Sequence, residues 1–514
     1  MQSATVATPA TPGTAAGLYS NAASPMIPTF ESGVPLSDIL NRFPVEMWEH
    51  VFSHMHAGEL VPSRRVCKAF YEITVRPFNR VIHWRSWHAF KQWNRNPLEG
   101  RLLYVPREVT VGPRHAPYYD SRDIEYSNIL PIVSDFHKLT SFTLSHVAFP
   151  LIDILHMIRG LPRLQHLQLN HVSRGPEDPF YNRPAPIMTC TSLRTIQLRH
   201  VVGTPLVGDE GLERLVKVLS LEGLNQIRMT LNTFIDLLES INQTRNTPTA
   251  SQPLPKLAST VRVFEVEVDR QVESLDTDFL DFIEYTNILV NWLQGCSQGL
   301  EHLSLRLCGD MPTPLDLVQF PNVIEYTGPH SLARGFKFGR AIQRVWVPAC
   351  PGPEHGEAWV MSRTIPARYS APLTHLSIWN FDTTDTSIHQ LFTAYPQLKE
   401  VSLVPSTPLT TFHYSLLSIS LESVPALTGL SIIQPDGALL PPDDCLSYED
   451  QLSLLGMYKR VCPLLEYVRF KPDLKHVWDS LLQRWAPVGY DGPQLFLPAD
   501  EAVSVPWYNR SSIF

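Results

Sequence analysis

Few residue patterns in this chain could carry out chemistry. His50 and His54 are four residues apart, which on a single helix is the spacing of two metal ligands, but only His56 could supply a third ligand nearby. Carboxylate groups in 276–281 and 382–385 stand where helices are expected to begin, and capping explains them without catalysis. We therefore predict no metal site and no acid–base pair.

Motifs for nucleophiles and cofactors are also missing. The 514 residues contain no G-x-G-x-x-G, no G-x-x-x-x-G-K-[ST], no H-E-x-x-H and no G-x-S-x-G. We expect a protein that is not an enzyme and has no cofactor.

A short basic and aromatic stretch, residues 334–346, could instead bind phosphate or nucleic acid. It contains Arg334, Lys337, Arg340 and Arg344 among three aromatic residues. The whole chain has 42 Lys and Arg against 50 Asp and Glu, a net charge of −8, which disfavours a nucleic-acid partner. We interpret the stretch as a solvated edge, with recognition of an acidic or phosphorylated protein as the alternative.

Hydropathy and cysteine usage indicate where the protein resides. No run approaches the ~18 apolar residues of a membrane span, and the N-terminal sequence lacks the basic and apolar regions of a secretory signal. The seven cysteines form no C-x-x-C pair, which favours a reducing compartment. We expect no membrane association and a location in the cytoplasm, the nucleus or both.

Most of the chain repeats one string. L-x-x-Φ-x-L-x-H-V, in which Φ is a large apolar residue, occurs at 139–147, 164–172 and 193–201. Weaker copies stand at 224–229, 261–266, 300–305, 342–347, 373–378, 398–403, 427–432 and 465–470. The alternation in Φ-x-L is that of a strand with one buried face, and amphipathic stretches such as 151–158 predict a helix between strands. The pattern predicts an α/β fold, an irregular leucine-rich-repeat solenoid with parallel strands on its concave face and helices on its convex face.

The residues between the buried positions of each strand are the candidates for binding a target. Arg199, Arg306 and Arg469 give this row positive charge, and Trp379 is its large aromatic residue. Trp379 could equally pack under residues 348–372 or under the C-terminal tail. His146, His171 and His200 occupy equivalent repeat positions, and we expect them to be neutral and hydrogen-bonded rather than to titrate together.

A helical module precedes the repeats. Met47 and Val51 are four residues apart, with Trp48 and Phe52 widening the apolar stripe, and Gly58 is expected to end this first helix. A second helical stretch follows. We divide the chain into a disordered tail (1–34), this module (35–80), the repeats (81–486) and a C-terminal tail (487–514). Forty residues are too few for a stable core, so the module should rest on a partner or on the next domain.

Residues 43–70 of this module resemble an F-box. FPVEMWEHVFSHM is similar to the Leu-Pro-x-Glu opening of that family, with Phe43 at the Leu position, and V-C-K-A-F is similar to its close, with Phe70 at the usual Trp. Pro62 is unusual there, so we expect the second helix to begin at it. The resemblance implies an adaptor-binding surface made of Phe43, Pro44, Met47, Trp48, Val51, Phe52, Leu60, Val66, Cys67 and Phe70.

An F-box followed by such repeats resembles the fungal type of F-box/leucine-rich-repeat protein. The resemblance implies the substrate-recognition subunit of an SCF cullin–RING ubiquitin ligase. The F-box would bind the Skp adaptor and through it the cullin, and the repeats would bind a target protein that the sequence does not identify. Three alternatives stay open: a ligase-independent scaffold, an enzyme hidden in the repeats, and a module that only caps the solenoid.

Overall fold

The computed structural model divides into two compact units, Met1–Pro77 (unit 1) and Phe78–Phe514 (unit 2). It describes residues 43–489 with gaps at 56, 95–104, 114–128, 150, 174–190, 202–209, 247–255, 268–281, 307–317, 330–331, 333–335, 348–372, 382–386, 406–408, 434–445 and 472–473. The predicted tail 1–34 lies outside these residues.

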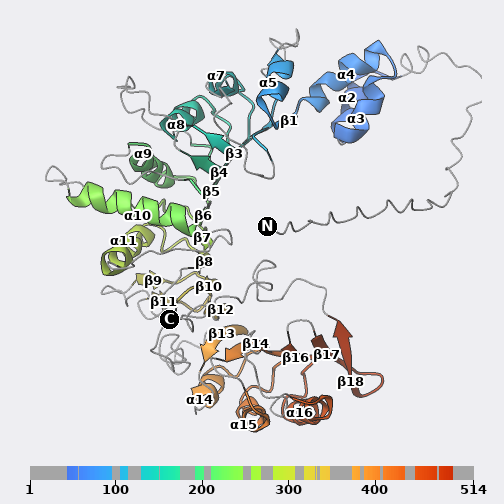
Figure 1. Ribbon diagram of the computed structural model, residues 1–514, viewed down its shortest axis with the longest axis vertical. Coiled ribbons are helices and arrows are strands. Elements are labelled where there is room, and N and C mark those ends of the chain that lie inside the picture. Colours follow the sequence, from blue (N-terminus) through green and yellow to red (C-terminus); the bar gives the residue numbers. More distant parts are fainter. Residues whose placement is uncertain are drawn as a thin grey trace, which may run out of the picture. The chain divides into compact units, whose positions relative to one another are not determined.

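Unit 1 contains three helices, α2 (Val45–Ser53), α3 (Ala57–Arg64) and α4 (Lys68–Phe78) (Figure 1). Pro44 precedes α2, where its fixed φ is compatible with the start of a helix, and its carbonyl accepts a hydrogen bond from the Met47 N–H at 3.0 Å. Each helix is at most eleven residues long, so packing between the helices has to stabilise them.

The helix boundaries differ from those expected at Gly58 and Pro62. α2 ends at Ser53, and Gly58 lies inside α3 rather than capping α2. Pro62 lies in the second half of α3, where it cannot donate to the carbonyl four residues back, and the helix ends two residues later. α4 then begins after Cys67, whose Sγ accepts a hydrogen bond from the Phe70 N–H at 3.4 Å. The single second helix of the prediction is therefore two helices.

Unit 2 is a mixed α/β structure around a 16-stranded sheet. In sheet order the strands are β1 (Val81–Trp84), β2 (Glu108–Val111), β3 (Ser141–Ala148), β4 (His166–Ser173), β5 (Thr195–Arg199), β6 (Gln226–Thr230), β7 (Val263–Glu267), β8 (His302–Leu305), β10 (Glu325–Thr327), β12 (Arg344–Val347), β13 (His375–Phe381), β14 (Glu400–Pro405), β15 (Gly429–Ile432), β16 (Tyr467–Lys471), β17 (Leu474–Asp479) and β18 (Arg484–Gly489). All neighbours up to β16 are parallel, and β17 and β18 are antiparallel. Each parallel strand pairs with the next described strand of this sheet.

All eleven repeat copies predicted from the sequence contribute a strand to this sheet. The sequence missed β1, β2 and β10, whose short apolar patterns lack the leucines of the repeat, and the closing hairpin β17–β18. It also missed a separate two-stranded sheet made of β9 (Val318–Phe320) and β11 (Phe336–Phe338). β18 continues to Gly489, so the expected boundary at 487 falls inside a strand.

Helices lie along one face of the sheet (Figure 1). They are α5 (Trp87–Asn94), α7 (Ile129–Ser134), α8 (Leu151–Arg159), α9 (Glu210–Leu219), α10 (Leu231–Asn246), α11 (Phe282–Gln294), α14 (Ser387–Ala394), α15 (Thr411–Leu421) and α16 (Tyr448–Val461). Consecutive helices pack on one another from α7 to α11 and from α14 to α16. The Φ and Leu positions of the strands, such as Leu167 and Leu169, are buried in the core with these helices. The other face of the sheet, which carries the residues between them, is called the polar face below.

Candidate functional site

An aromatic cluster holds the helices of unit 1 together. The Trp48 ring lies 5.9 Å from that of Phe52 and 5.0 Å from that of Phe70, measured between ring centroids. Phe52 and Phe70 meet edge to face at 5.2 Å. Leu60 of α3 is buried, at 1% exposure. These side chains form the small core of unit 1.

The same unit exposes large apolar side chains to solvent. Phe43, Met47, Val51 and Val66 are each about half exposed, at 47–52%. Met47 and Val51 are one helical turn apart on α2 and therefore lie on the same face of that helix. Three more exposed apolar residues belong to this unit: Val45, Val61 and Tyr71. Exposed apolar groups gathered on so small a unit mark a surface that a partner covers.

The ten residues predicted to bind the adaptor therefore divide in two. Phe43, Pro44, Met47, Val51 and Val66 are exposed and open to a partner. Trp48, Phe52, Leu60, Cys67 and Phe70 lie partly or wholly inside unit 1, and their contact with the adaptor stays a prediction. A helix of this length has to bury some of its apolar stripe against its own neighbours, and sequence alone does not reveal which part.

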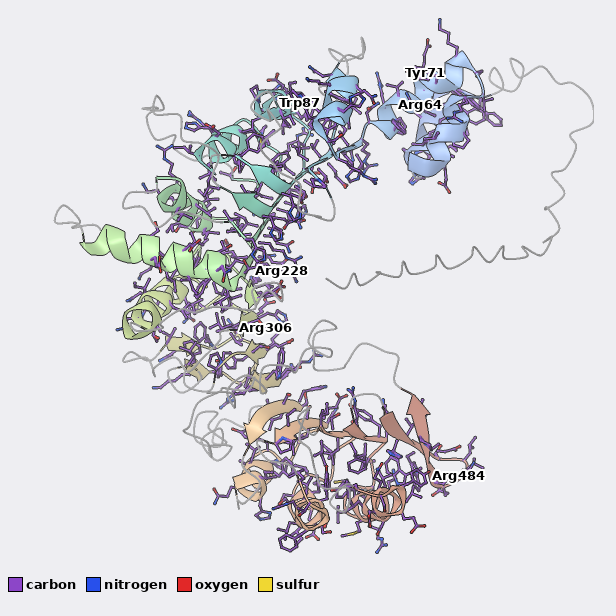
Figure 2. The ribbon with its side chains drawn as sticks, viewed as in Figure 1. Arg64, Tyr71, Trp87, Arg228, Arg306 and Arg484 are labelled. Carbon is purple, nitrogen blue, oxygen red and sulfur yellow. The ribbon has the colours of Figure 1, made fainter. Side chains whose placement is uncertain are left out.

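Sequence reasoning missed Tyr71. Its ring lies 4.6 Å from the guanidinium carbon of Arg64, a cation–π contact between α4 and α3 (Figure 2). Tyr71 follows directly after Phe70, so helical periodicity places it about 100° from the buried stripe. That periodicity could have identified it as a surface aromatic.

Paired charges dominate the middle of the polar face in unit 2. Arg228 Nε lies 2.6 Å from Glu265 Oε2, and Arg199 Nη2 lies 3.2 Å from Glu267 Oε2. Glu325 Oε2 is approached by Arg344 at 3.5 Å and by His302 at 3.6 Å. Burial raises the pKa of Glu265 even though Arg228 lowers it. The face thus offers alternating charges, and Arg199, Arg228 and Arg344 already have carboxylate partners within the chain.

Two of the four predicted target-binding residues are placed on this face. Arg199 ends β5 with its side chain 45% exposed. Arg306 directly follows β8 on the same sheet (Figure 2), with its guanidinium carbon 4.9 Å from the Trp346 ring. Trp346 is one of the three aromatic residues of the basic stretch 334–346 and lies between Val345 and Val347 in β12.

The other two residues predicted to bind the target, Trp379 and Arg469, are not placed as exposed side chains on this face. Trp379 pairs with Val404 between β13 and β14, and its side chain lies outside the described residues. Arg469 is only 5% exposed, which corrects its prediction as a target-binding residue. The reason is that β17 adds a further strand with Lys475 opposite Arg469, so that β16 is not the edge of the sheet.

The basic stretch 334–346 is divided between two sheets. Lys337 lies in β11 of the two-stranded sheet, whereas Arg344 lies in β12 of the large sheet and faces Glu325. Arg334 lies outside the described residues.

The three repeat histidines form a stack. The rings of His146 and His171, and those of His171 and His200, are 4.3 Å apart and nearly parallel. All three have positive φ values of 48–53°, a left-handed conformation that histidine tolerates better than branched residues do. Burial, with a contribution from His200, lowers the pKa of His146, which favours a neutral His146 ring at pH 7.

The buried cysteines and the histidines of α2 are poor candidates for catalysis or metal binding. Burial raises the pKa of Cys296 to about 12 and that of Cys462 to about 11, so neither thiol is a nucleophile near neutral pH. His50 and His54 stack edge to face at 4.8 Å, and within the described ranges no three His, Cys, Asp or Glu side chains could hold a metal ion. None of the described helices is long and apolar enough to cross a membrane.

Comparison with known proteins finds a matching family for a segment of unit 1 and no matching protein for the whole chain. No curated protein matches the chain. The model of the F-box domain family matches residues 40–80, the segment that contains α2, α3 and α4. F-box domains bind the Skp adaptor and assemble into SCF complexes. The helices whose apolar side chains stand exposed in unit 1 are therefore those of an F-box domain.

Proposed function

We propose that the protein is the substrate-recognition subunit of an SCF cullin–RING ubiquitin ligase. The observation that carries the proposal is the F-box match at residues 40–80 together with the half-exposed apolar side chains of α2. These side chains are what a Skp adaptor would cover, since water-exposed apolar groups gain free energy when a partner buries them.

The repeats of unit 2 are, in this proposal, a leucine-rich-repeat solenoid of the kind found in fungal F-box proteins. Three observations support it: the recurring string, one strand for each copy, and a parallel order that follows the chain. A repeat array needs only nearest-neighbour contacts, so it can present many strands to one partner.

The target binds on the polar face between β5 and β12. Arg199 and Arg306, the second held against the buried ring of Trp346, place two guanidinium groups on this face, and arginine is common at interface hot spots. Because the charges there alternate, the target is selected by a matching pattern of charges rather than by overall acidity.

The chain itself has no catalytic role in this proposal. Ubiquitin transfer is carried out by the partner enzymes, and this protein brings the target close to them. The ligase operates in the cytoplasm or the nucleus. The second candidate function, a scaffold that binds the adaptor without a ligase, is favoured by the same exposed face of α2 and differs only in whether the cullin joins.

Reconstitution distinguishes these two functions. The full chain is mixed with Skp adaptor, cullin and RING subunit and separated by size exclusion. We expect one complex that contains all four proteins and transfers ubiquitin to a captured target. Co-elution of the adaptor without the cullin would leave only the scaffold, and failure to bind the adaptor would reject both functions.

The target-binding face has its own test. Replacing Arg199 and Arg306 with Ala should abolish capture of proteins that depend on unit 2, while adaptor binding persists. A matched control replaces Lys217 and Arg460, which are exposed on α9 and α16, with Ala. Equal loss of capture in the control would show that the effect is not specific to the polar face.

A further inference from the structure

Helix α15 is apolar on both of its faces. Tyr414, Leu417 and Leu421 are buried against unit 2, while Phe412, Leu416 and Ile419 on the other side are 43–66% exposed. Its first turn contains no acidic residue and its last turn contains no basic residue. Helices that are apolar all round are normally buried on every side, so something is expected to cover this one.

The exposed apolar surface continues onto the next helix. α15 packs against α16, on which Tyr448 and Leu452 are exposed and four residues apart (Figure 1). The preceding helix differs, because the exposed residues described on α14 are His389, Gln390 and Thr393. Among these three described helices, the apolar patch is therefore confined to α15 and α16.

The size of the patch decides what kind of occupant fits. Five partly exposed side chains supply at most roughly 500 Å² of apolar surface. A stable interface between separate molecules usually needs about 800 Å² from each partner. A segment of the same chain needs less, because its tether holds it at high effective concentration.

The chain ends with a suitable segment. β18 finishes at Gly489 beside β17, and α16 contacts β17 through Gln451 Oε1, 3.1 Å from His476 Nε2. The seven residues from Gly489 to Phe496 can span about 23 Å when extended. Residues 490–514 include Leu495-Phe496-Leu497 and Trp507-Tyr508, with few charges among them.

We propose that residues 490–514 cover the apolar face formed by Phe412, Leu416, Ile419, Tyr448 and Leu452. The segment closes the C-terminal end of unit 2 and keeps this patch from binding other proteins. Neither the adaptor nor the target-binding face takes part, so this inference does not depend on the proposed function.

Photo-cross-linking in the full chain tests the proposal. A benzophenone analogue of phenylalanine replaces Phe412, and the same probe at Gln390 on α14 is the control. We expect the probe at 412, and not that at 390, to cross-link to a peptide from 490–514 within one chain. Cross-links that join two chains, or cross-links only to other parts of the same chain, would overturn the proposal.

Hydrogen exchange gives an independent readout in a variant that retains its full length. Replacing Leu495, Phe496 and Leu497 with Ser should accelerate exchange of residues 411–421 about tenfold or more and leave α8 unchanged as an internal reference. Unchanged exchange in α15 would contradict the proposal.

Discussion

Units 1 and 2 both contain regularly spaced apolar residues, but these residues are buried in the strands of unit 2, whereas several are half exposed in unit 1. In unit 2, Leu198 of β5 lies between neighbouring strands and is fully buried, as are its equivalents along the sheet. In unit 1, Met47 and Val51 follow an equally regular pattern, yet they remain about half exposed. A repeated strand is covered by the next repeat, whereas a three-helix unit has no next copy to cover it.

This contrast explains why the pattern alone overestimates the interface of unit 1. Periodicity marks every apolar residue on a stripe, but the unit uses Phe52 and Leu60 for its own small core. Apolar residues in unit 1 should therefore separate into those that stabilise folding and those that bind a partner. In unit 2 the buried apolar residues of the strands should affect stability only.

The largest effect is expected in the core of unit 2. Leu198→Ala should lower the free energy of unfolding by about 3 kcal/mol, because it removes a fully buried side chain and leaves a cavity. Urea denaturation of the full chain measures this. Adaptor binding should be unchanged. A loss of adaptor affinity in a folded L198A chain would mean that the two units are not separable in function.

A smaller effect is expected at the Arg228–Glu265 pair of the polar face. Arg228→Ala leaves a partly buried carboxylate without its 2.6 Å partner, and we expect a cost of about 1 kcal/mol. Glu265→Gln should cost less, since burial already raises the pKa of this group. Thermal unfolding of both variants checks the asymmetry, and equal destabilisation would contradict it.

The third and smallest effect concerns pH. Burial lowers the pKa of His146, so the unfolded chain binds more protons there than the folded chain as the pH falls. The contribution of His146 to the free energy of unfolding is complete above the ordinary pKa of histidine, about 6.5. It is lost as the pH falls through the lower pKa that His146 has in the folded chain. Burial also lowers the pKa of His375 and His476, which adds to the same trend.

Asparagine can test the contribution of the stack, because it tolerates the left-handed backbone but does not titrate. A chain with His146, His171 and His200 all replaced by Asn should lose less stability between pH 7.5 and pH 5.5 than the unmodified chain. His389→Asn on the exposed side of α14 is the control and should leave the pH dependence unchanged.

Sequence reasoning was most successful where many copies agree. The eleven Φ-x-L strings all lie in the sheet. In each string the two apolar residues are two positions apart, so both side chains lie on the same face of the strand and that face is the buried one. Prediction from the sequence was least successful for strands that do not follow the repeat. β10 has only three residues, and the hairpin β17–β18 pairs antiparallel, so neither follows the repeat.

The candidate sites were predictable only in part. Arg199 and Arg306 could be placed from their position in the repeat. The burial of Arg469 depends on β17, which no repeat predicts, and the sequence does not show that Trp346 contacts Arg306. The ion pairs with Glu265 and Glu267 depend on the register between strands, which the sequence does not state.

Calorimetric titration of the full chain with the Skp adaptor tests the central claim most directly. A Met47→Asp, Val51→Asp variant changes two exposed side chains, so folding should be intact, while loss of apolar contacts at an interface can cost ~2 kcal/mol or more. Val488→Asp, at a similarly exposed apolar residue of β18, is the control. We predict at least a thirtyfold weaker affinity for the α2 variant and none of this loss for the control. Equal affinity of the α2 variant and the unmodified chain would contradict the assignment of the α2 face as the adaptor-binding surface.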